Sequence, residues 1–279
     1  MSKGTAPLTT IIGREPGRVR LVQITDCHLY READGKLLGL KTLESFHAVR
    51  DAVKAEHDVP DLALVTGDIS QDGTAESYQR LCAGVTELSY PQYWIPGQHD
   101  DLPVMAEHLH GANIHADKRL LAGARWQIVM LNSGVPHRVY GKFLQDQLDL
   151  LAQALHDYPD RHLLVVLHHH PVKVHCFWLD TIGLNNPDAM MALLKKHKKQ
   201  VVVLWGHIHQ AFDSVQDGMR LLATPSTCVQ FKPFSQDFQA DTENPGYRLL
   251  NLNDDGSVDS NVVRVDSVEF TIDYSVKGY

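Results

Sequence analysis

The sequence predicts an α/β protein in which short buried strands alternate with amphipathic helices. Two observations predict this class. Runs that are nearly continuous in Val, Ile and Leu recur along the chain, as expected for strands buried on both faces. Segments with apolar residues at helical spacing separate several of these runs. A strand–helix–strand order of this kind indicates stacked layers of sheet and helix.

The expected elements follow one another in order along the chain. We expect strands at 19–24, 62–65, 93–95, 126–131, 162–167 and 201–205. We expect helices at 43–56, 75–88, 143–155 and 187–196. Each strand runs directly into polar residues, so its end is well marked.

After Phe212 the pattern changes to shorter strands that Gly and Pro residues separate, with no clear helix. Such a β-rich tail is compatible with a second sheet packed on the first. We therefore expect one domain over 1–279, a β-sandwich covered by helices. Its motif-bearing core spans about 19–210, and its β-rich part spans about 211–279. The stretch from Asp259 onward could cover an active-site edge or pack against a second subunit.

Composition narrows the classes of function. The chain has 279 residues, 43% of them hydrophobic, and a net charge of −8 with neutral histidines. This acidic balance argues against nucleic acid or anionic lipid as partners. We expect no membrane span, since no run of about 18 apolar residues occurs, and no signal peptide at 1–17. The four cysteines form no CxxC pair, so a cytoplasmic protein with reduced thiols is the simplest interpretation.

Potential metal ligands follow five of the predicted strands, at the point where each strand ends. They are Asp26, His28, Asp68, Gln98, His168, His207 and His209, and His99 directly follows Gln98. Functional groups in open α/β sheets collect at the carboxyl ends of strands, so we expect these side chains to lie together. Carboxylates and imidazoles suit Zn, Fe, Mn and similar divalent ions. The set therefore predicts a metal site with mixed oxygen and nitrogen ligands.

Each motif also has a plain structural explanation when taken alone. Asp26 could cap a turn, Asp68 follows a glycine as in many turns, and the 168–170 histidine run could be a polar surface segment. The pair His207 and His209 is more specific, because alternation in an extended chain aims both rings to one side. All the motifs together, each at a strand end, favour the metal site.

The combined pattern resembles the calcineurin-like metallophosphoesterase superfamily, whose motifs are DxH, GD, GNHD, H and GHxH. The matching segment runs from about Val19 to Gln210. The resemblance implies a four-layer fold, in which two mixed β-sheets form a sandwich flanked by helices. It also implies two divalent metal ions per chain, Fe and/or Mn, or alternatively Zn. Two ions about 3.5–4 Å apart can hold a bridging hydroxide and stabilise in-line displacement at phosphorus.

The resemblance also implies a role for each residue of the set. The ligands of one metal would be Asp26, His28 and His209. The ligands of the other would be Gln98, His168 and His207. Asp68 would bridge the ions, and His99 would lie beside the leaving oxygen as stabiliser or general acid, which makes these two the catalytic residues. The residues that contact the substrate would be His28, Gln98, His99 and His209.

Three neighbouring histidines compete for one ligand position. His168 directly follows the strand and precedes a second histidine, as the ligand does in the family. His169 is the competitor. His170 stands where many relatives have proline, so we leave it out of the site.

One position departs from the family pattern. Where the family has Gly-Asn-His-Asp, this chain has Gly97-Gln98-His99-Asp100. Gln keeps the amide oxygen but adds a methylene, which can displace the oxygen by roughly 1.5 Å, whereas a ligand tolerates only about ±0.2 Å. We therefore hypothesise weaker occupancy of the second metal, or slower turnover, than Asn would give. We expect Asp100 to support His99 or a neighbouring loop.

Further segments resemble bacterial class III cyclic nucleotide phosphodiesterases. They are 168–172, 176–180 and 222–233, and the likeness extends to the end at Lys277-Gly278-Tyr279. This resemblance implies hydrolysis of 3′,5′-cyclic AMP to 5′-AMP in the cytoplasm, which lowers cyclic AMP signalling. Phe231 and Trp178 either offer a flat face to the purine or pack beneath the site. We expect Cys27 and Cys228 to be small core residues.

Two other functions stay open. The first is a broader-specificity phosphodiesterase or a nuclease of the same superfamily, although a nuclease should carry a basic groove. The second is a metal- or nucleotide-binding protein whose activity Gln98 has weakened. Nothing in the sequence predicts an oligomeric state.

Overall fold

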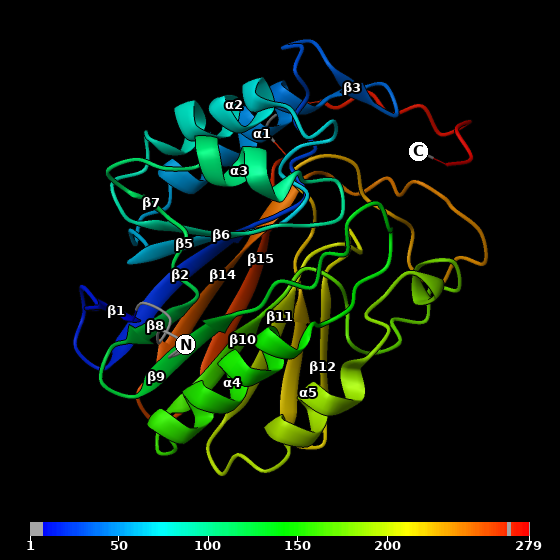
Figure 1. The fold of residues 1–279 in the computed structure, drawn as a ribbon. Coiled ribbons are helices and arrows are strands. Elements are labelled where there is room, and N and C mark those ends of the chain that lie inside the picture. Colours follow the sequence, from blue (N-terminus) through cyan, green and yellow to red (C-terminus); the bar gives the residue numbers. More distant parts are fainter. Residues whose placement is uncertain (1–7, 267–268, 279) are drawn as a thin grey trace.

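The computed structural model describes residues 8–266 and 269–278, which form two large mixed β-sheets (Figure 1). The first sheet contains, in spatial order, β1 (Leu8–Ile11), β8 (Arg119–Ala122), β9 (Trp126–Met130), β10 (His162–Val166), β11 (Val201–Trp205), β13 (Met219–Ala223) and β12 (Phe212–Gln216). The second contains β15 (Val258–Arg264), β14 (Gly246–Asn253), β2 (Arg18–Ile24), β5 (Leu62–Thr66), β6 (Gln92–Ile95) and β7 (Ile114–His115). A small hairpin joins β3 (Lys36–Leu37) to β4 (Leu40–Lys41).

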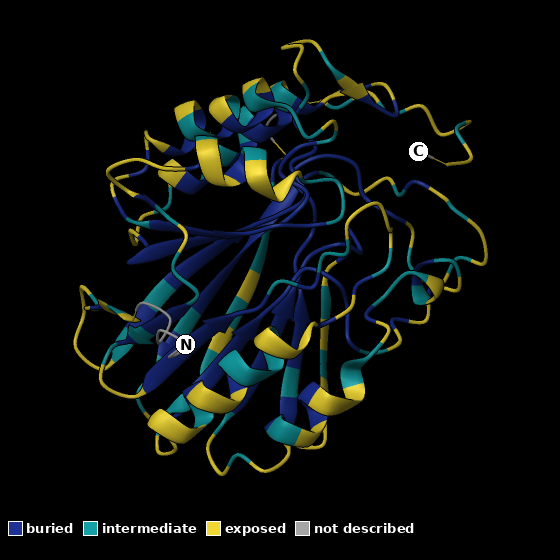
Figure 2. Ribbon diagram, in the orientation of Figure 1, coloured by how far each residue is buried: buried dark blue, intermediate teal, exposed yellow. Residues whose placement is uncertain are grey.

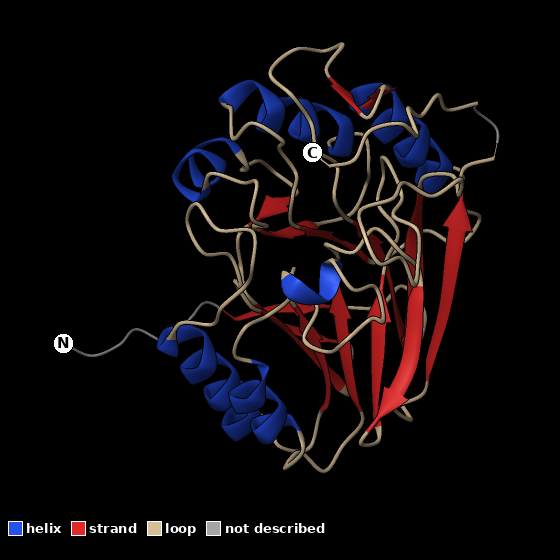
Figure 3. Cartoon of the chain, turned by 90° about the vertical axis from the view of Figure 1, so that its right-hand side faces the viewer, coloured by secondary structure: helices blue, strands red, loops and turns tan. Residues whose placement is uncertain are grey.

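Helices cover the outer face of each sheet (Figure 3). The second sheet packs against α1 (Thr42–Lys54), α2 (Ala75–Val85) and α3 (Leu102–His108). The first packs against α4 (Gln145–Asp157) and α5 (Pro187–Leu194), with a short 3-10 helix, η1, at Leu179–Thr181. The predicted fold class, two mixed sheets in a sandwich flanked by helices, is therefore confirmed.

Apolar side chains from both sheets fill the space between them. Figure 2 shows that the central strands of both sheets are mostly buried. Leu21 and Leu64 of the second sheet meet Ile128, Leu164 and Leu204 of the first, and each is fully buried. Burying one such side chain contributes roughly 1.5–3 kcal/mol. Because the helices cover the other face, the central strands are buried on both sides, and this explains their unbroken apolar sequences.

The six expected strands and four expected helices all occur, with ends that differ by a few residues. Helix α3 was not expected from the sequence. It begins where the Asp101 carboxylate accepts a hydrogen bond from the backbone N–H of Val104, with Pro103 in its first turn. Both features are typical helix starts, but the helix is too short to show an apolar periodicity.

The β-rich part after Phe212 does not form a second sheet of its own, because its strands are divided between the two sheets: β12 and β13 lie in the first, and β14 and β15 lie in the second, beside the strand of the first motif. Strand β14 pairs antiparallel with β2, and β15 forms the edge beyond it. This pairing supports our proposal that residues 1–279 form one domain, although residues 1–7, 267–268 and 279 lie outside the described parts. The stretch 269–278 lies against the β3–β4 hairpin, where the Asp273 N–H donates to the Leu38 carbonyl at 2.7 Å. No helix within 8–266 or 269–278 combines the length and the apolar character needed to cross a membrane.

A buried glutamine joins the two sheets near the carboxyl end of β2. The Gln23 amide nitrogen donates to the Thr66 hydroxyl at 2.7 Å and to the Trp205 carbonyl at 3.2 Å. Its amide oxygen accepts from the Thr224 hydroxyl. The bonds link β2 and β5 of one sheet to β11 and β13 of the other, so they fix how the sheet edges meet.

We expect Gln23→Leu to lower the free energy of unfolding by about 2–3 kcal/mol, because it leaves several buried polar groups without a partner. Urea unfolding of chelator-treated protein measures this without a contribution from bound metal. The matched control is Gln153→Leu, which removes an exposed hydrogen bond to Asp157 on α4 and should change stability by less than about 0.5 kcal/mol. Equal effects of the two substitutions would contradict a structural role for the link.

Candidate metal centre

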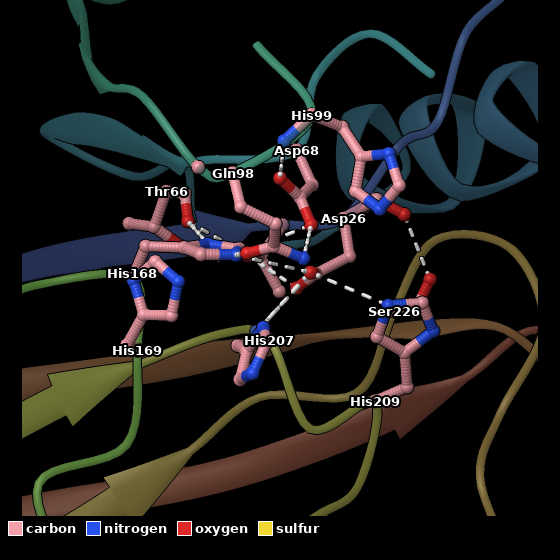
Figure 4. Close-up of polar contacts among 12 residues, drawn as sticks. Asp26, Thr66, Asp68, Gln98, His99, His168, His169, His207, His209 and Ser226 are labelled. Atoms are coloured by element: carbon pink, nitrogen blue, oxygen red, sulfur yellow. Dashed lines mark hydrogen bonds and ion pairs between the residues drawn. The ribbon is translucent and has the colours of Figure 1, made fainter. Parts of the chain in front are cut away.

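The predicted site residues converge between the sheets, at the carboxyl ends of five strands (Figure 4). Those that follow β2, β5 and β6 come from the second sheet, and those that follow β10 and β11 come from the first. The residues that the structure brings together are Asp26, His28, Asp68, Gln98, His99, His168, His207 and His209. Gln98 and His99 are half-buried, whereas the others are buried. The site therefore opens toward Gln98 and His99.

The backbone at these strand ends is strained rather than extended. Asp26, His28, Asp68, His207 and His209 all have positive φ, between 46° and 66°. Residues other than glycine in this region cost on the order of 1–3 kcal/mol each, and such strain concentrates at functional sites. The expectation that His207 and His209 share a side through extended-chain alternation was therefore wrong in its mechanism. Tight turns bring these rings into the site instead.

Glycines in the motifs allow the strand ends to approach one another. A Cβ on Gly67, which has φ +92°, would lie 2.4 Å from the Nδ1 atom of His168. A Cβ on Gly206 would lie 2.1 Å from the Thr25 hydroxyl oxygen. Neither position has room for a side chain, so each glycine is needed for the two sheets to meet here.

The first group of ligand atoms is centred on His28 and His209. Their Nε2 atoms are 3.2 Å apart. Each Nδ1 faces an acceptor, the Gln71 amide oxygen at 2.5 Å and the Val229 carbonyl at 2.8 Å, so each Nδ1 carries the hydrogen. The two Nε2 lone pairs therefore face one another, which is repulsive without a cation. Two nitrogens about 2.0–2.1 Å from one tetrahedral metal lie about 3.4 Å apart, so the pair fits a shared ion.

Asp26 completes this first group. Its Oδ1 atom lies 3.3 Å from Nε2 of His209. Its carboxylate is held by the hydroxyl of Thr25 at 2.7 Å and by the backbone N–H of His207 at 3.0 Å. One carboxylate and two imidazoles then surround one point.

The second group contains Asp68, His168 and His207, whose ligand atoms lie within 4.8 Å of one another. The Nδ1 atom of His168 faces the Thr66 carbonyl at 2.8 Å, so in the neutral ring the Nε2 atom carries the lone pair, and this atom lies 3.2 Å from the Asp68 carboxylate. Both ring nitrogens of His207 are buried and have no hydrogen-bond partner among the described residues. Buried polar atoms are normally paired, so these nitrogens suit a metal ligand.

Asp68 lies between the two groups. Its Oδ2 atom is 3.2 Å from Nε2 of His168 and 3.9 Å from Nε2 of His28. Its Oδ1 atom accepts the backbone N–H of His99 at 2.9 Å. Burial raises the pKa of Asp68, but the nearby His168, His99 and His28 outweigh this and hold it well below its usual value. This carboxylate is therefore an anion placed where it could join two cations.

The charge state of the histidines fits the same arrangement. Burial lowers the pKa of His28 to about 3, and burial together with the neighbouring histidines holds the pKa of His207 well below its usual value. Both rings are thus neutral and can act as ligands. Burial also lowers the pKa of His168, but the Asp68 and Asp26 carboxylates raise it to about 9. The pocket around His168 therefore attracts positive charge, which a divalent ion supplies without protonating the ring.

Gln98 reaches the second group despite its longer side chain. Its amide oxygen lies 2.9 Å from Nε2 of His168, so it aims at the same point as the imidazole lone pair. Its amide nitrogen donates to Oδ2 of Asp68 at 2.5 Å. That oxygen is the one placed between the two groups, so Gln98 engages the atom that would bridge the ions.

The three neighbouring histidines have different contacts. His168 enters the second group, as described above. His169 points its Nδ1 atom at the Ser133 hydroxyl, 2.8 Å away, outside the groups of potential ligands found among the described residues. His170 stacks on the ring of His207 with centroids 5.5 Å apart, and its Nε2 atom lies 3.8 Å from Asp180.

Two residues support the site in ways that the sequence did not predict or left undecided. Gln71, which orients His28, carries no motif. Asp100 supports the loops around the site, since its carboxylate accepts from the N–H groups of Gly97 and Ser70 at 2.9 and 3.0 Å. Burial and the Asp68 charge raise the pKa of Asp100 to about 6. A sequence pattern could have found only Asp100, because it ends the four-residue motif.

The aromatic and cysteine residues near the site are mainly packing groups. Phe231 is 1% exposed and stacks on His209 with ring centroids 4.1 Å apart, and Trp178 meets it edge-on. Of the two possibilities for this pair, packing beneath the site is the one that the structure supports. Cys27 and Cys228 are buried as expected, although Cys228 has its sulfur within 4.8 Å of ligand atoms of His28 and His209.

The sequence is similar to a known protein family and to individual enzymes. The sequence profile of the calcineurin-like phosphoesterases matches residues 19–211. The 3′,5′-cyclic adenosine monophosphate phosphodiesterase CpdA of Pseudomonas aeruginosa is 43% identical over 261 residues, which cover 94% of this chain and 95% of that protein. The enzyme of the same name from Escherichia coli K12 is 42% identical over 265 residues, with 94% and 95% coverage.

Solved structures share the fold at much lower sequence identity. A purple acid phosphatase from yellow lupin seeds aligns with a TM-score of 0.65 and 13% identity, covering 96% of this chain and 54% of that one. A dimetal phosphatase from Danio rerio aligns with a TM-score of 0.60 and 16% identity, covering 90% and 100%. These likenesses concern the fold alone.

We expect Gln71→Ala to weaken Mn²⁺ binding by about 10-fold, because the residue that orients a ligating histidine typically contributes that much. Calorimetric titration of chelator-treated protein measures the affinity. Gln145→Ala, on the exposed surface of α4, is the control and should bind Mn²⁺ as the unmodified protein does. Unchanged affinity in Gln71→Ala would show that His28 does not depend on this contact.

Proposed function

We propose that this chain, which belongs to the calcineurin-like phosphoesterase family, hydrolyses 3′,5′-cyclic AMP to 5′-AMP and so lowers cyclic AMP signalling. The observation that carries the proposal is the pair of buried ligand groups joined by Asp68. The substrate follows from the relatives named above, which match the chain over nearly its whole length and are cyclic AMP phosphodiesterases.

The family implies a dinuclear centre of divalent metal ions, and the donor set fits one. We propose that one ion is held by Asp26, His28 and His209, and the other by Gln98, His168 and His207, with Asp68 shared. Mixed carboxylate, amide and imidazole ligands suit Fe or Mn, with Zn as an alternative. When bound, two such ions neutralise phosphate charge and supply an activated water-derived nucleophile.

The residues of the chain position the substrate and its leaving group. His99 lies at the open side of the site, with its ring edge-on to that of His28 at 5.1 Å between centroids. Its backbone N–H donates to Asp68 at 2.9 Å, which holds this residue beside the ligand groups. We assign it the donation of a hydrogen bond or proton to the departing 3′-oxygen. The phosphate would contact His28, Gln98, His99 and His209.

Charge argues against the alternative of a nuclease. The net charge of −8 opposes a polyanionic backbone. The other alternative, a protein that binds metal or nucleotide without turnover, rests on the departure from the family motif at Gln98. The assay below distinguishes such a protein from an enzyme. The four cysteines are free, and this supports a reducing, cytoplasmic location.

Purified protein supplied with Mn²⁺ should convert 3′,5′-cyclic AMP to 5′-AMP, and chelation should abolish this. His99→Asn should lower kcat by about 100-fold, the scale of a lost general acid, while leaving the metal content unchanged. Product analysis by chromatography and metal analysis by mass spectrometry check both points. Tight cyclic AMP binding without turnover would support the binding protein, and preferred cleavage of single-stranded DNA would support the nuclease.

We expect Gln98→Asn to raise occupancy of the second metal or turnover, because the shorter amide would bring its oxygen to the metal without engaging Asp68. Metal content per chain and kcat for cyclic AMP are measured side by side. Gln98→Leu, which has no amide, is the control and should lower both. An unchanged stoichiometry and rate in Gln98→Asn would refute the hypothesis that Gln98 weakens the site.

A further inference from the structure

A cleft of about 470 Å³ opens beside the ligand groups and shares Gln98 and His99 with them. One wall is the segment after β6, and the other is the segment after β9. We propose that this cleft holds the nucleoside half of cyclic AMP, an inference that rests on the phosphodiesterase function proposed above. A cyclic nucleotide with its phosphate at the ligand groups would then extend its ribose and purine past His99.

The walls offer apolar surface on both sides of the cleft. Leu102, which is 42% exposed, and Pro103 lie on one wall, and Val135 and Pro136 lie on the other. Exposed apolar residues that face a cavity of this size are typical of sites for flat organic ligands. A purine ring has two apolar faces and polar edges, so it can fill the space between these walls.

The negative charge of the residues that line the cleft favours an uncharged part of the ligand. Asp72, Asp100 and Asp101 are the charged lining residues other than histidine, and no lysine or arginine lies among the described residues around the cleft. A second phosphate would be repelled here, whereas ribose hydroxyls and an exocyclic amine can donate hydrogen bonds to the carboxylates of Asp72 and Asp101, which are exposed. The cleft therefore suits a nucleoside and disfavours an oligonucleotide, which would place its next phosphate against this wall.

Both walls are held in place by hydrogen bonds of their own. The backbone N–H of Asp101 donates to the Tyr78 hydroxyl at 2.8 Å, and the Asp101 carboxylate caps α3 at Val104. On the other wall, the amide oxygen of Asn132 accepts from the N–H of Gly134 at 2.8 Å. A preformed cleft loses less conformational freedom when it binds its ligand.

The test uses the full chain loaded with Mn²⁺. Val135→Ser should raise KM for cyclic AMP by about 10-fold, the effect of lost apolar contact in a pocket, with kcat nearly unchanged because the contact is the same in the ground and transition states. Val215→Ser, at a residue 72% exposed on β12 far along the sheet, is the matched control and should leave KM unchanged. A second pair, Leu102→Ser with Leu144→Ser as control, repeats the test on the opposite wall.

Binding measurements separate this inference from the proposed function. Calorimetry with 5′-AMP should show weaker binding to Val135→Ser and Leu102→Ser than to their controls, whereas inhibition by inorganic phosphate should be the same in all four. If the unmodified protein fails to hydrolyse cyclic AMP, the proposed function is wrong, yet 5′-AMP binding still tests the cleft. If cyclic AMP is hydrolysed but neither pair differs in KM or in 5′-AMP affinity, the nucleoside lies elsewhere.

Discussion

The site depends on one electrostatic constraint, the convergence of buried lone pairs on a small volume. The Nε2 atoms of His28 and His209 face each other at 3.2 Å, and that of His168 faces Asp68 at the same distance. Backbone carbonyls and Gln71 hold the Nδ1 hydrogens on the far sides of these rings. The donors therefore cannot turn away, and only positive charge between them relieves the repulsion. The fold itself thus creates a place that favours a cation.

Burial of apolar side chains in the sandwich stabilises the strained backbone that brings these lone pairs together. Five site residues adopt positive φ, and each adds strain on the order of 1–3 kcal/mol. The apolar core between the sheets and the two outer clusters under the helices offset that strain. The Gln23 link lies just below the ligands and joins both sheets. The same architecture thus places ligands from opposite sheets within reach of one another and keeps them there.

Much of the fold could be predicted, because unbroken apolar strands are a direct consequence of burial on both faces. That the candidate ligands of one sheet lie together could be predicted, because the carboxyl ends of neighbouring parallel strands meet at one edge of a sheet. That the edges of two sheets would meet here could not, because this depends on how the sheets pack. What could not be predicted depends on contacts between distant segments. Gln71 reaches His28 across 43 residues, and the turns that orient His207 and His209 rely on positive φ, which the sequence did not reveal. The short helix α3 could not be predicted either, because it is too short to show an apolar periodicity although its first turn has a typical helix start.

The position of β14 has a consequence for the order in which the site forms. Strand β2 carries the first two ligands at its end, and its neighbours in the sheet are β5 on one side and β14 on the other. During synthesis β2 emerges long before β14, so one edge of β2 stays unpaired until β14 has been made. The earliest ligands are therefore fixed in their native geometry only after residues 246–253 arrive. The proposed metal centre would therefore be completed only after this pairing, when Asp26 and His28 are held beside the candidate ligands from the other strands.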